Sequence, residues 1–155
     1  MAQGTRCGDI LNKLYELAVH DTKIFPASSE LACVLTAHAT ADVWSAWAEI
    51  VDDTAVTPVT LSASFAACDG HVTGMITESA NQDSTIYMVE AAFGSAKTII
   101  SRWRVASHIS LVSSSGQSTA RGEHIPEGET VYYRMKCATA GSKTLNVHFR
   151  HFCHD

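Results

Sequence analysis

After Pro26, apolar residues alternate with polar ones along most of the chain, and this period constrains the fold more than any other feature. Side chains on a β-strand point to opposite faces in turn, so a period of two predicts strands with one buried face. We expect strands over 31–36, 43–51, 59–65, 71–78, 85–93, 97–105, 130–137 and 143–153. Turn residues such as Asp69-Gly70 and Gly141-Ser142 separate these runs at intervals of roughly eight to twelve residues. The pattern predicts an all-β domain, an antiparallel jelly-roll-like β-sandwich.

Residues 1–25 follow a different period. Asp9 is a residue type that caps helix N-termini, and the apolar residues after it recur at spacings of three and four. Phe25-Pro26 then interrupts the helical pattern. We therefore expect an N-terminal arm with a short helix over 1–25 and a sandwich body over 26–155. The apolar stripe packs on the body or reaches a partner, and its members are candidate partner-binding residues: Ile10, Leu11, Leu14 and Leu17.

Composition places the chain among globular domains of ordinary size, since 46% of its residues are apolar and 17% are charged. The net charge of −5 disfavours nucleic acid as a partner. The charge is uneven: residues 1–96 hold 3 basic and 12 acidic side chains, whereas residues 97–155 hold 8 basic and 4 acidic ones. The two halves either mix their charges in one fold or form complementary patches between copies of the chain.

The five cysteines are scattered, odd in number and without a C-x-x-C pair: Cys7, Cys33, Cys68, Cys137 and Cys153. This pattern favours free thiols in a reducing cytoplasm, most of them small core residues. The start of the chain lacks the long apolar stretch of a signal peptide, and no run reaches the roughly 18 apolar residues that span a bilayer. We expect a protein made and folded in the cytosol with no membrane partner.

Histidines near the C-terminus raise the question of a metal. His148, His151 and His154 lie near Cys153, but alternation sends His148 and His154 to one strand face and His151 and Cys153 to the other. A single chain cannot gather all four around one ion without a bend. A ring of histidines around a symmetry axis stays open as an alternative to surface or stacked histidines. We predict no metal and no cofactor.

Catalytic arrangements have little support in the sequence. No motif beside Cys137 or Cys153 supplies an oriented base and an oxyanion donor. Adjacent Asp52 and Asp53 point apart or cap a turn, which does not suit paired carboxylates. We predict no catalytic residues and no enzymatic activity.

Aromatic and basic residues are better suited to binding. Trp44 and Trp47 are three apart and should lie on opposite strand faces, with at least one in the core. An exposed tryptophan is typical of a protein interface or of a sugar-stacking platform. Arg102 and Arg104 share a strand face that is either solvated or meets acidic groups of a partner. Trp103, Arg102 and Arg104 are therefore further candidate partner-binding residues.

Several strand and turn patterns resemble those of a known group of proteins. Residues 123–137 (EHIPEGETVYYRMKC), the Gly-Ser turn after them and residues 145–152 (LNVHFRHF) resemble the end of small β-sandwich structural proteins of tailed-phage virions. The runs 44–52, 87–94 and 99–105 are similar to the same group. The resemblance covers roughly residues 43–153 and carries no site residues. It implies jelly-roll or related sandwiches, often trimeric, that decorate or cement capsids or that join tails and fibres.

These observations lead to one expected function and two alternatives. We expect a non-enzymatic bacteriophage structural protein, a capsid decoration or cement protein. Its partners would be itself, as a homotrimer, and the major capsid protein or another virion protein on the capsid surface. A carbohydrate- or receptor-binding module of a phage tail or fibre is the alternative. A small β-barrel enzyme is the third reading, and it has no motif behind it.

Overall fold

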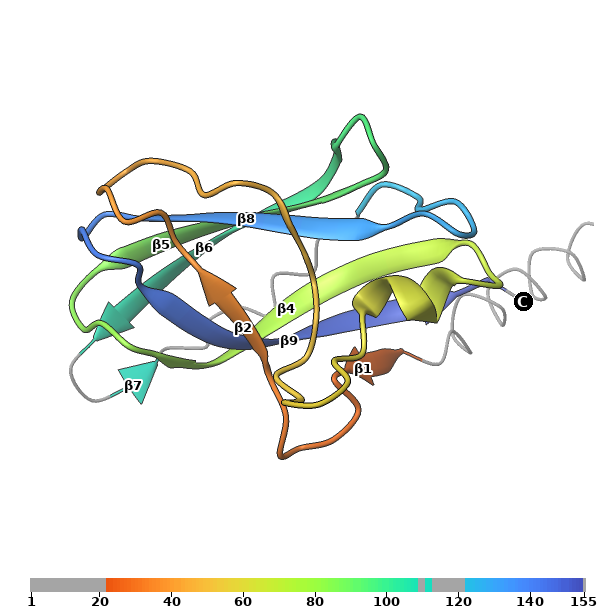
Figure 1. The fold of residues 1–155 in the computed structure, drawn as a ribbon, viewed down its shortest axis with the longest axis horizontal. Helices are drawn as coiled ribbons and strands as arrows, with labels where there is room; N and C mark the ends of the chain where they lie inside the picture. Colours follow the sequence, from red (N-terminus) through yellow and green to blue (C-terminus); the bar gives the residue numbers. More distant parts are fainter. Residues whose placement is uncertain (1–21, 109–110, 113–121, 155) are drawn as a thin grey trace, which may run out of the picture.

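The computed structural model describes residues 22–108, 111–112 and 122–154. Within these residues almost all regular structure is β, arranged in two antiparallel sheets (Figure 1). The predicted all-β, antiparallel class is therefore confirmed. The predicted helical stripe of Ile10, Leu11, Leu14 and Leu17 lies outside the described residues.

The first sheet is organised around its last strand, β9 (Thr144–Cys153). Strand β4 (Gly70–Ala80) pairs with β9 along most of its length. Strands β1 (Lys23–Phe25) and β2 (Cys33–Thr36) pair with successive parts of β9. The C-terminal strand thus holds together segments from both ends of the described chain.

The second sheet has the order β3-β8-β5-β6-β7. Its strands are β3 (Ala48–Glu49), β8 (Val131–Cys137), β5 (Ile86–Phe93), β6 (Thr98–His108) and β7 (Leu111–Val112). A tight turn joins β5 to β6, with Gly94 and Lys97 at φ values of 71° and 56°. Glycine suits such a position because it has no Cβ to clash in the left-handed region.

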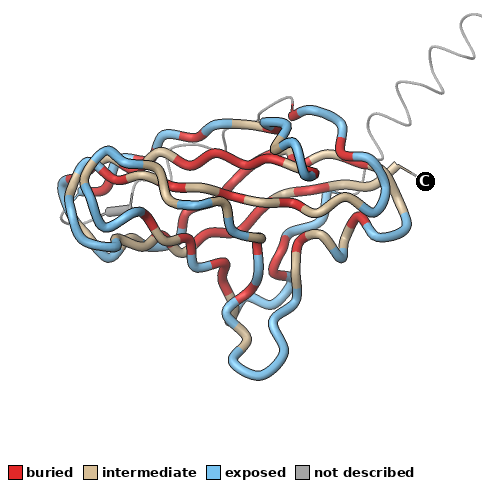
Figure 2. The backbone as a smooth tube through the Cα atoms, turned by 45° about the horizontal axis from the view of Figure 1, so that its top comes forward, coloured by how far each residue is buried: buried red, intermediate tan, exposed pale blue. Residues whose placement is uncertain are grey.

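The core lies between the two sheets, and the alternation along β8 shows why. Val131, Tyr133, Met135 and Cys137 are buried, whereas the residues between them are partly exposed. The rings of Trp103 and Phe149 join the sheets across the core, with centroids 6.0 Å apart. Figure 2 shows buried segments running through the middle of the molecule and exposed segments at the loops.

Two predicted strands take a different form. Residues 59–65 were expected to be extended, but Leu61–Phe65 forms a 3₁₀ helix, η1. Thr60 caps it, since its Oγ1 accepts from the Ala63 N–H at 3.2 Å, and Leu61 and Phe65 are both buried. Of the predicted strand 43–51, Ala48–Glu49 alone forms a ladder, β3, and residues 43–47 run beside it without one. None of the described helices has the length and apolar character that crossing a bilayer requires.

The last residues of the predicted arm are part of the first sheet. Lys23–Phe25 pairs with His151, Arg150 and Phe149 of β9, and Phe25 is buried in the core. The predicted boundary at Pro26 assigned Lys23–Phe25 to the arm, and the structure pairs these residues with the first sheet of the body.

Candidate functional site

The outer side of the second sheet carries a group of aromatic and basic side chains that we call the tryptophan–arginine face. Its members are Trp44, Trp47, Glu90, Arg102, Arg104, Arg134 and Lys136. The guanidinium carbon of Arg134 lies 4.8 Å from the Trp44 ring centroid and 4.6 Å from that of Trp47. These distances are within the range of cation–π contacts.

Glu90 is the anchor of this face. Its side chain is fully buried, and it pairs directly across the sheet with Arg102 on β6 and Arg134 on β8. Arg134 Nε donates to Glu90 Oε2 at 2.6 Å, and Arg102 Nε donates to Oε1 at 2.6 Å. Both carboxylate oxygens are thereby engaged, so a buried charge is compensated by two cations.

The structure changes the roles predicted for the tryptophans. Trp103 is 3% exposed and packs in the core, so its prediction as a partner-binding residue is wrong. The alternation that exposes Arg102 and Arg104 turns Trp103 inward. Neither Trp44 nor Trp47 belongs to the buried core, because residues 43–47 form no ladder and both rings lie against Arg134.

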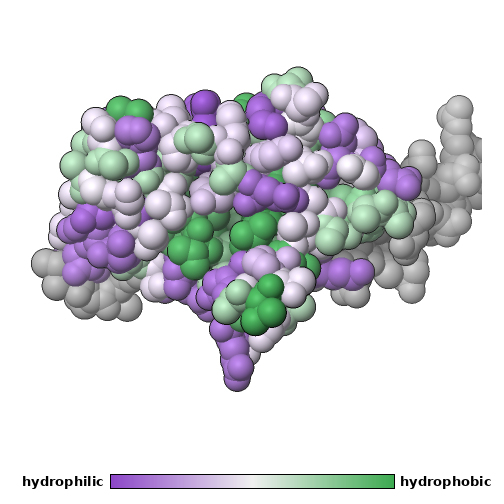
Figure 3. Space-filling view, in the orientation of Figure 1, coloured by the Kyte–Doolittle hydropathy of each residue, from purple (hydrophilic) through white to green (hydrophobic). Residues whose placement is uncertain are grey.

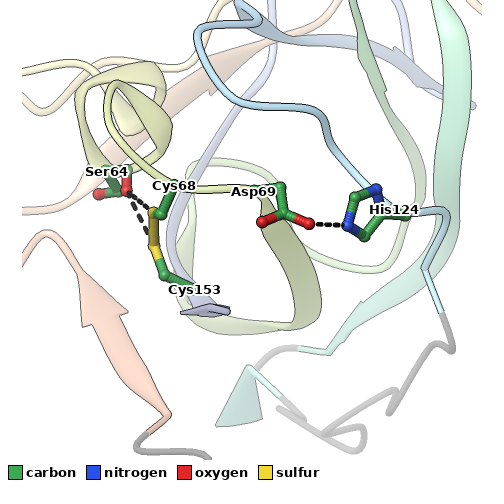
Figure 4. The surroundings of a disulfide bond; sticks show 5 residues. All are labelled: Ser64, Cys68, Asp69, His124 and Cys153. Carbon is green, nitrogen blue, oxygen red and sulfur yellow. Dashed lines mark hydrogen bonds and ion pairs between the residues drawn. A yellow bond between two sulfur atoms is a disulfide. The ribbon is translucent and has the colours of Figure 1, made fainter. Parts of the chain in front are cut away.

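A second group, the histidine cluster, lies at the end of the first sheet. It consists of His71 on β4, His124 before β8 and His154 after β9. One ligand nitrogen from each ring lies within 4.8 Å of the other two. The ring centroids are 5.2 to 5.5 Å apart, and the Phe152 ring lies beside His71 and His154. Asp69 contacts His124 through Oδ2 and Nε2, as Figure 4 shows.

Sequence reasoning named His154 but missed His71 and His124. The three residues come from distant parts of the chain and meet through the β4–β9 pairing, which places His71 opposite Phe152. His148 and His151 do not join them. His148 Nε2 lies 3.0 Å from Glu78 Oε1, and His151 is buried beside Phe65.

The prediction of free thiols is wrong for two cysteines. Cys68 and Cys153 form a disulfide with a Cα–Cα distance of 5.7 Å, beside the Ser64 carbonyl (Figure 4). They lie 85 residues apart in sequence, and no local pattern could pair them. Cys33 and Cys137 are buried free thiols, and Cys7 lies outside the described residues. Burial raises the pKa of Cys33 to about 12, which keeps it protonated and unsuited to nucleophilic attack.

Residues of β1, β4 and β9 and of the segment after β1 line an open concavity. An open pocket of about 230 Å³ is lined by Ile24, Pro26, Ala27, Ser28, Ser29, Ile76, Glu78 and His148. This is smaller than the roughly 300–1,000 Å³ of most small-molecule sites. Figure 3 shows apolar residues in several separate patches among polar ones on this side of the molecule.

Comparison of the chain with protein-family models, with curated proteins and with solved structures gives no match. A function for this chain therefore rests on its own residues, and the tryptophan–arginine face and the histidine cluster are its two candidate sites.

Proposed function

We propose that this chain is a non-enzymatic structural protein that docks onto protein surfaces through the tryptophan–arginine face. The observation that carries the proposal is Arg134, which is held between two tryptophan rings and the buried carboxylate of Glu90. Tryptophan and arginine are the residue types most enriched at the energetic centres of protein interfaces. A guanidinium that is already ordered loses little conformational entropy when a partner binds it.

Charge points to a second copy of the chain as the occupant of this face. The face presents Arg102, Arg104 and Lys136 to solvent, and one carboxylate, Glu90, is buried beneath it. Exposed acidic residues lie on and beside the first sheet: Glu78 is on β4, and Glu30 and Asp53 flank the start of β2. A basic face that docks on the acidic side of the next copy makes a heterologous contact, which forms a closed trimer when each copy is rotated by a third of a turn.

The number of copies and the setting come from the resemblance to virion sandwich proteins. We propose a homotrimer that decorates or cements a bacteriophage capsid by binding the major capsid protein, because three linked copies gain effective concentration on a shell. A jelly-roll-like arrangement of the two facing sheets is part of this proposal. The Cys68–Cys153 disulfide is consistent with a protein that is made in the host cytoplasm and functions on a virion outside the cell.

Light scattering of the purified chain tests the proposal. At physiological salt we expect a mass of about three chains of 16.7 kDa, decreasing as salt screens the charges between copies. Arg104→Glu should shift the population toward monomer. Lys143→Glu, which makes the same charge change in the turn between β8 and β9, should leave the mass unchanged. A monomer at every protein concentration would contradict the trimer.

A carbohydrate- or receptor-binding module of a tail or fibre is the second candidate. The partly exposed Trp44 and Trp47 support it, since aromatic rings held against a sheet can stack on sugars. Titration with a panel of oligosaccharides, followed by tryptophan fluorescence, distinguishes the two. A saturable signal that Trp47→Ala abolishes in a folded protein favours sugar binding, and a flat response argues against it.

A further inference from the structure

We infer that His71, His124 and His154 bind one divalent transition-metal ion, for which Zn²⁺ is the best fit, with Asp69 orienting His124 or completing the coordination. Nitrogen ligands from three histidines suit Zn²⁺, which takes four ligands in protein sites. The three ligand nitrogens already lie within 4.8 Å of one another. This inference does not depend on the proposed docking function.

Backbone hydrogen bonds at or next to each histidine hold the three segments together. Gly70, next to His71, exchanges two hydrogen bonds with Ile125, next to His124, with N···O distances of 3.0 and 2.8 Å. The N–H of His154 donates to the Asp69 carbonyl at 2.8 Å. The disulfide then ties the residue before Asp69 to the residue before His154. The three segments are therefore positioned before any ion binds.

Close approach of these segments requires glycine at position 70. A Cβ at Gly70 would lie 2.1 Å from the Phe152 carbonyl oxygen, a distance that no side chain tolerates. The missing side chain lets the start of β4 lie directly against the end of β9. His71 and His154 consequently lie close enough for ring contact, with centroids 5.2 Å apart.

Hydrogen bonds orient two of the rings for metal binding. His71 Nδ1 lies 3.0 Å from the Gly122 carbonyl oxygen, which can only accept, so the proton is on Nδ1 and the lone pair is on Nε2. His124 Nε2 contacts the Asp69 carboxylate, and a ring that donates there keeps its lone pair on Nδ1. Metal-bound histidines commonly donate their second ring N–H to a carbonyl or carboxylate, which fixes the tautomer.

The site needs a small contraction to bind an ion. Zn–N bonds of about 2.0–2.1 Å in a tetrahedral site bring ligand nitrogens to about 3.4 Å from each other. Rotation of the exposed side chains can supply this change, because His124 is 48% exposed and its partner Asp69 is 44% exposed. The same exposure gives the ion a path from solvent. Water or an Asp69 oxygen would take the fourth position.

Cobalt titration of the full-length chain tests the site, using protein without a histidine tag and stripped with a chelator. Co²⁺ should bind at one ion per chain and give the visible absorption of a four- or five-coordinate ion. One equivalent of Zn²⁺ should abolish this absorption. A thiolate charge-transfer band should be absent, because the nearby Cys153 sulfur is in the disulfide.

Variants locate the ion. His124→Ala removes an exposed ligand and should weaken binding by at least about 10–100-fold. Asp69→Asn should weaken it by about 10-fold, because it removes the charge that orients His124. The control His108→Ala removes an exposed histidine on β6 and should bind Co²⁺ like the unchanged chain. The inference is overturned if excess Co²⁺ gives no absorption, or if His124→Ala and His154→Ala both bind normally.

Discussion

The tryptophan–arginine face and the histidine cluster differ in how completely their polar groups are satisfied. In the face, Glu90 is fully buried and both of its oxygens accept from arginine. In the cluster, His71 and His124 each engage one ring nitrogen, and the other ring nitrogen carries a lone pair that can bind an ion. The face is complete without a ligand, whereas the cluster acquires a complete set of partners when an ion binds.

The two sites also differ in how the fold brings their residues together. The face is assembled by direct cross-strand neighbours on β6, β5 and β8, so sheet register alone brings Arg102, Glu90 and Arg134 together. The cluster joins segments that lie far apart in sequence, and it relies on a disulfide and a few backbone hydrogen bonds. We therefore expect that each site can be disrupted while the other persists.

Loss of the disulfide should lower the free energy of unfolding more than the other changes proposed here. It should also weaken the histidine cluster. The disulfide joins residues 85 apart, and by chain entropy it stabilises folding by about 4 to 5 kcal/mol. The double variant Cys68→Ser, Cys153→Ser should lose this stabilisation. Urea unfolding measures this loss, and Zn²⁺ affinity should fall with it. The oligomer mass should persist under conditions in which the variant is folded. Equal stability of the variant and the oxidised parent would contradict the stabilising role, as would a non-reducing peptide map that lacks the Cys68–Cys153 link.

Alternation predicted most strands correctly because strands such as β8 have one buried face and one partly exposed face. Alternation failed at residues 59–65, because Leu61 and Phe65 are four residues apart. That spacing is two periods of an alternating strand, and it is also about one turn of a helix. The Thr60 cap and the hydrogen bond from Ser62 Oγ to Glu49 Oε1, at 2.6 Å, favour the helix there. These contacts depend on tertiary structure that a local pattern does not contain.

The candidate sites were predictable to different degrees. The exposed side of Arg102 and Arg104 followed from alternation, but Glu90 between the arginines required the register of three strands. The histidine cluster required the pairing of β4 with β9, which no local pattern specifies. Histidines beside the Asp69-Gly70 turn and at the chain end were the available signal. A search for residues that antiparallel pairing brings to one sheet end would have included them.

Removal of both cations from Glu90 should cause the next largest loss in the free energy of unfolding. This change affects the tryptophan–arginine face. The double variant Arg102→Met, Arg134→Met leaves a buried carboxylate unpaired, which costs about 3–5 kcal/mol. Adding Glu90→Gln should recover most of this loss, because the uncompensated charge is gone. Urea unfolding at neutral pH measures all three proteins.

Two comparisons make that result specific. Arg104→Met changes an exposed arginine on the same strand, and it should alter the free energy of unfolding by less than about 0.5 kcal/mol. Cobalt binding at the histidine cluster should stay normal in the folded double variant. If Arg104→Met destabilises the chain as much as the double variant does, compensation of the Glu90 charge is not what stabilises this face.

Acid should reveal a third, smaller difference, between His151 in the core and the exposed histidines. Burial, and then the nearby Lys23 cation, lower the pKa of His151 to about 4 from its usual 6.5. Between these two pH values the unfolded chain binds a proton that the folded chain does not. Stability therefore falls as pH drops from about 6.5 to 4, by up to about 3 kcal/mol, with no contribution from this group above that window.

Urea unfolding of the parent chain and of His151→Gln at pH 7 and pH 4.5 isolates this contribution. The parent should lose more stability than the variant between the two pH values, because glutamine does not titrate. His108→Gln replaces an exposed histidine and should keep the acid loss of the parent. An identical loss in the parent and in His151→Gln would show that His151 takes up its proton equally in both states, and that Phe65 and the core around it do not exclude the charged ring.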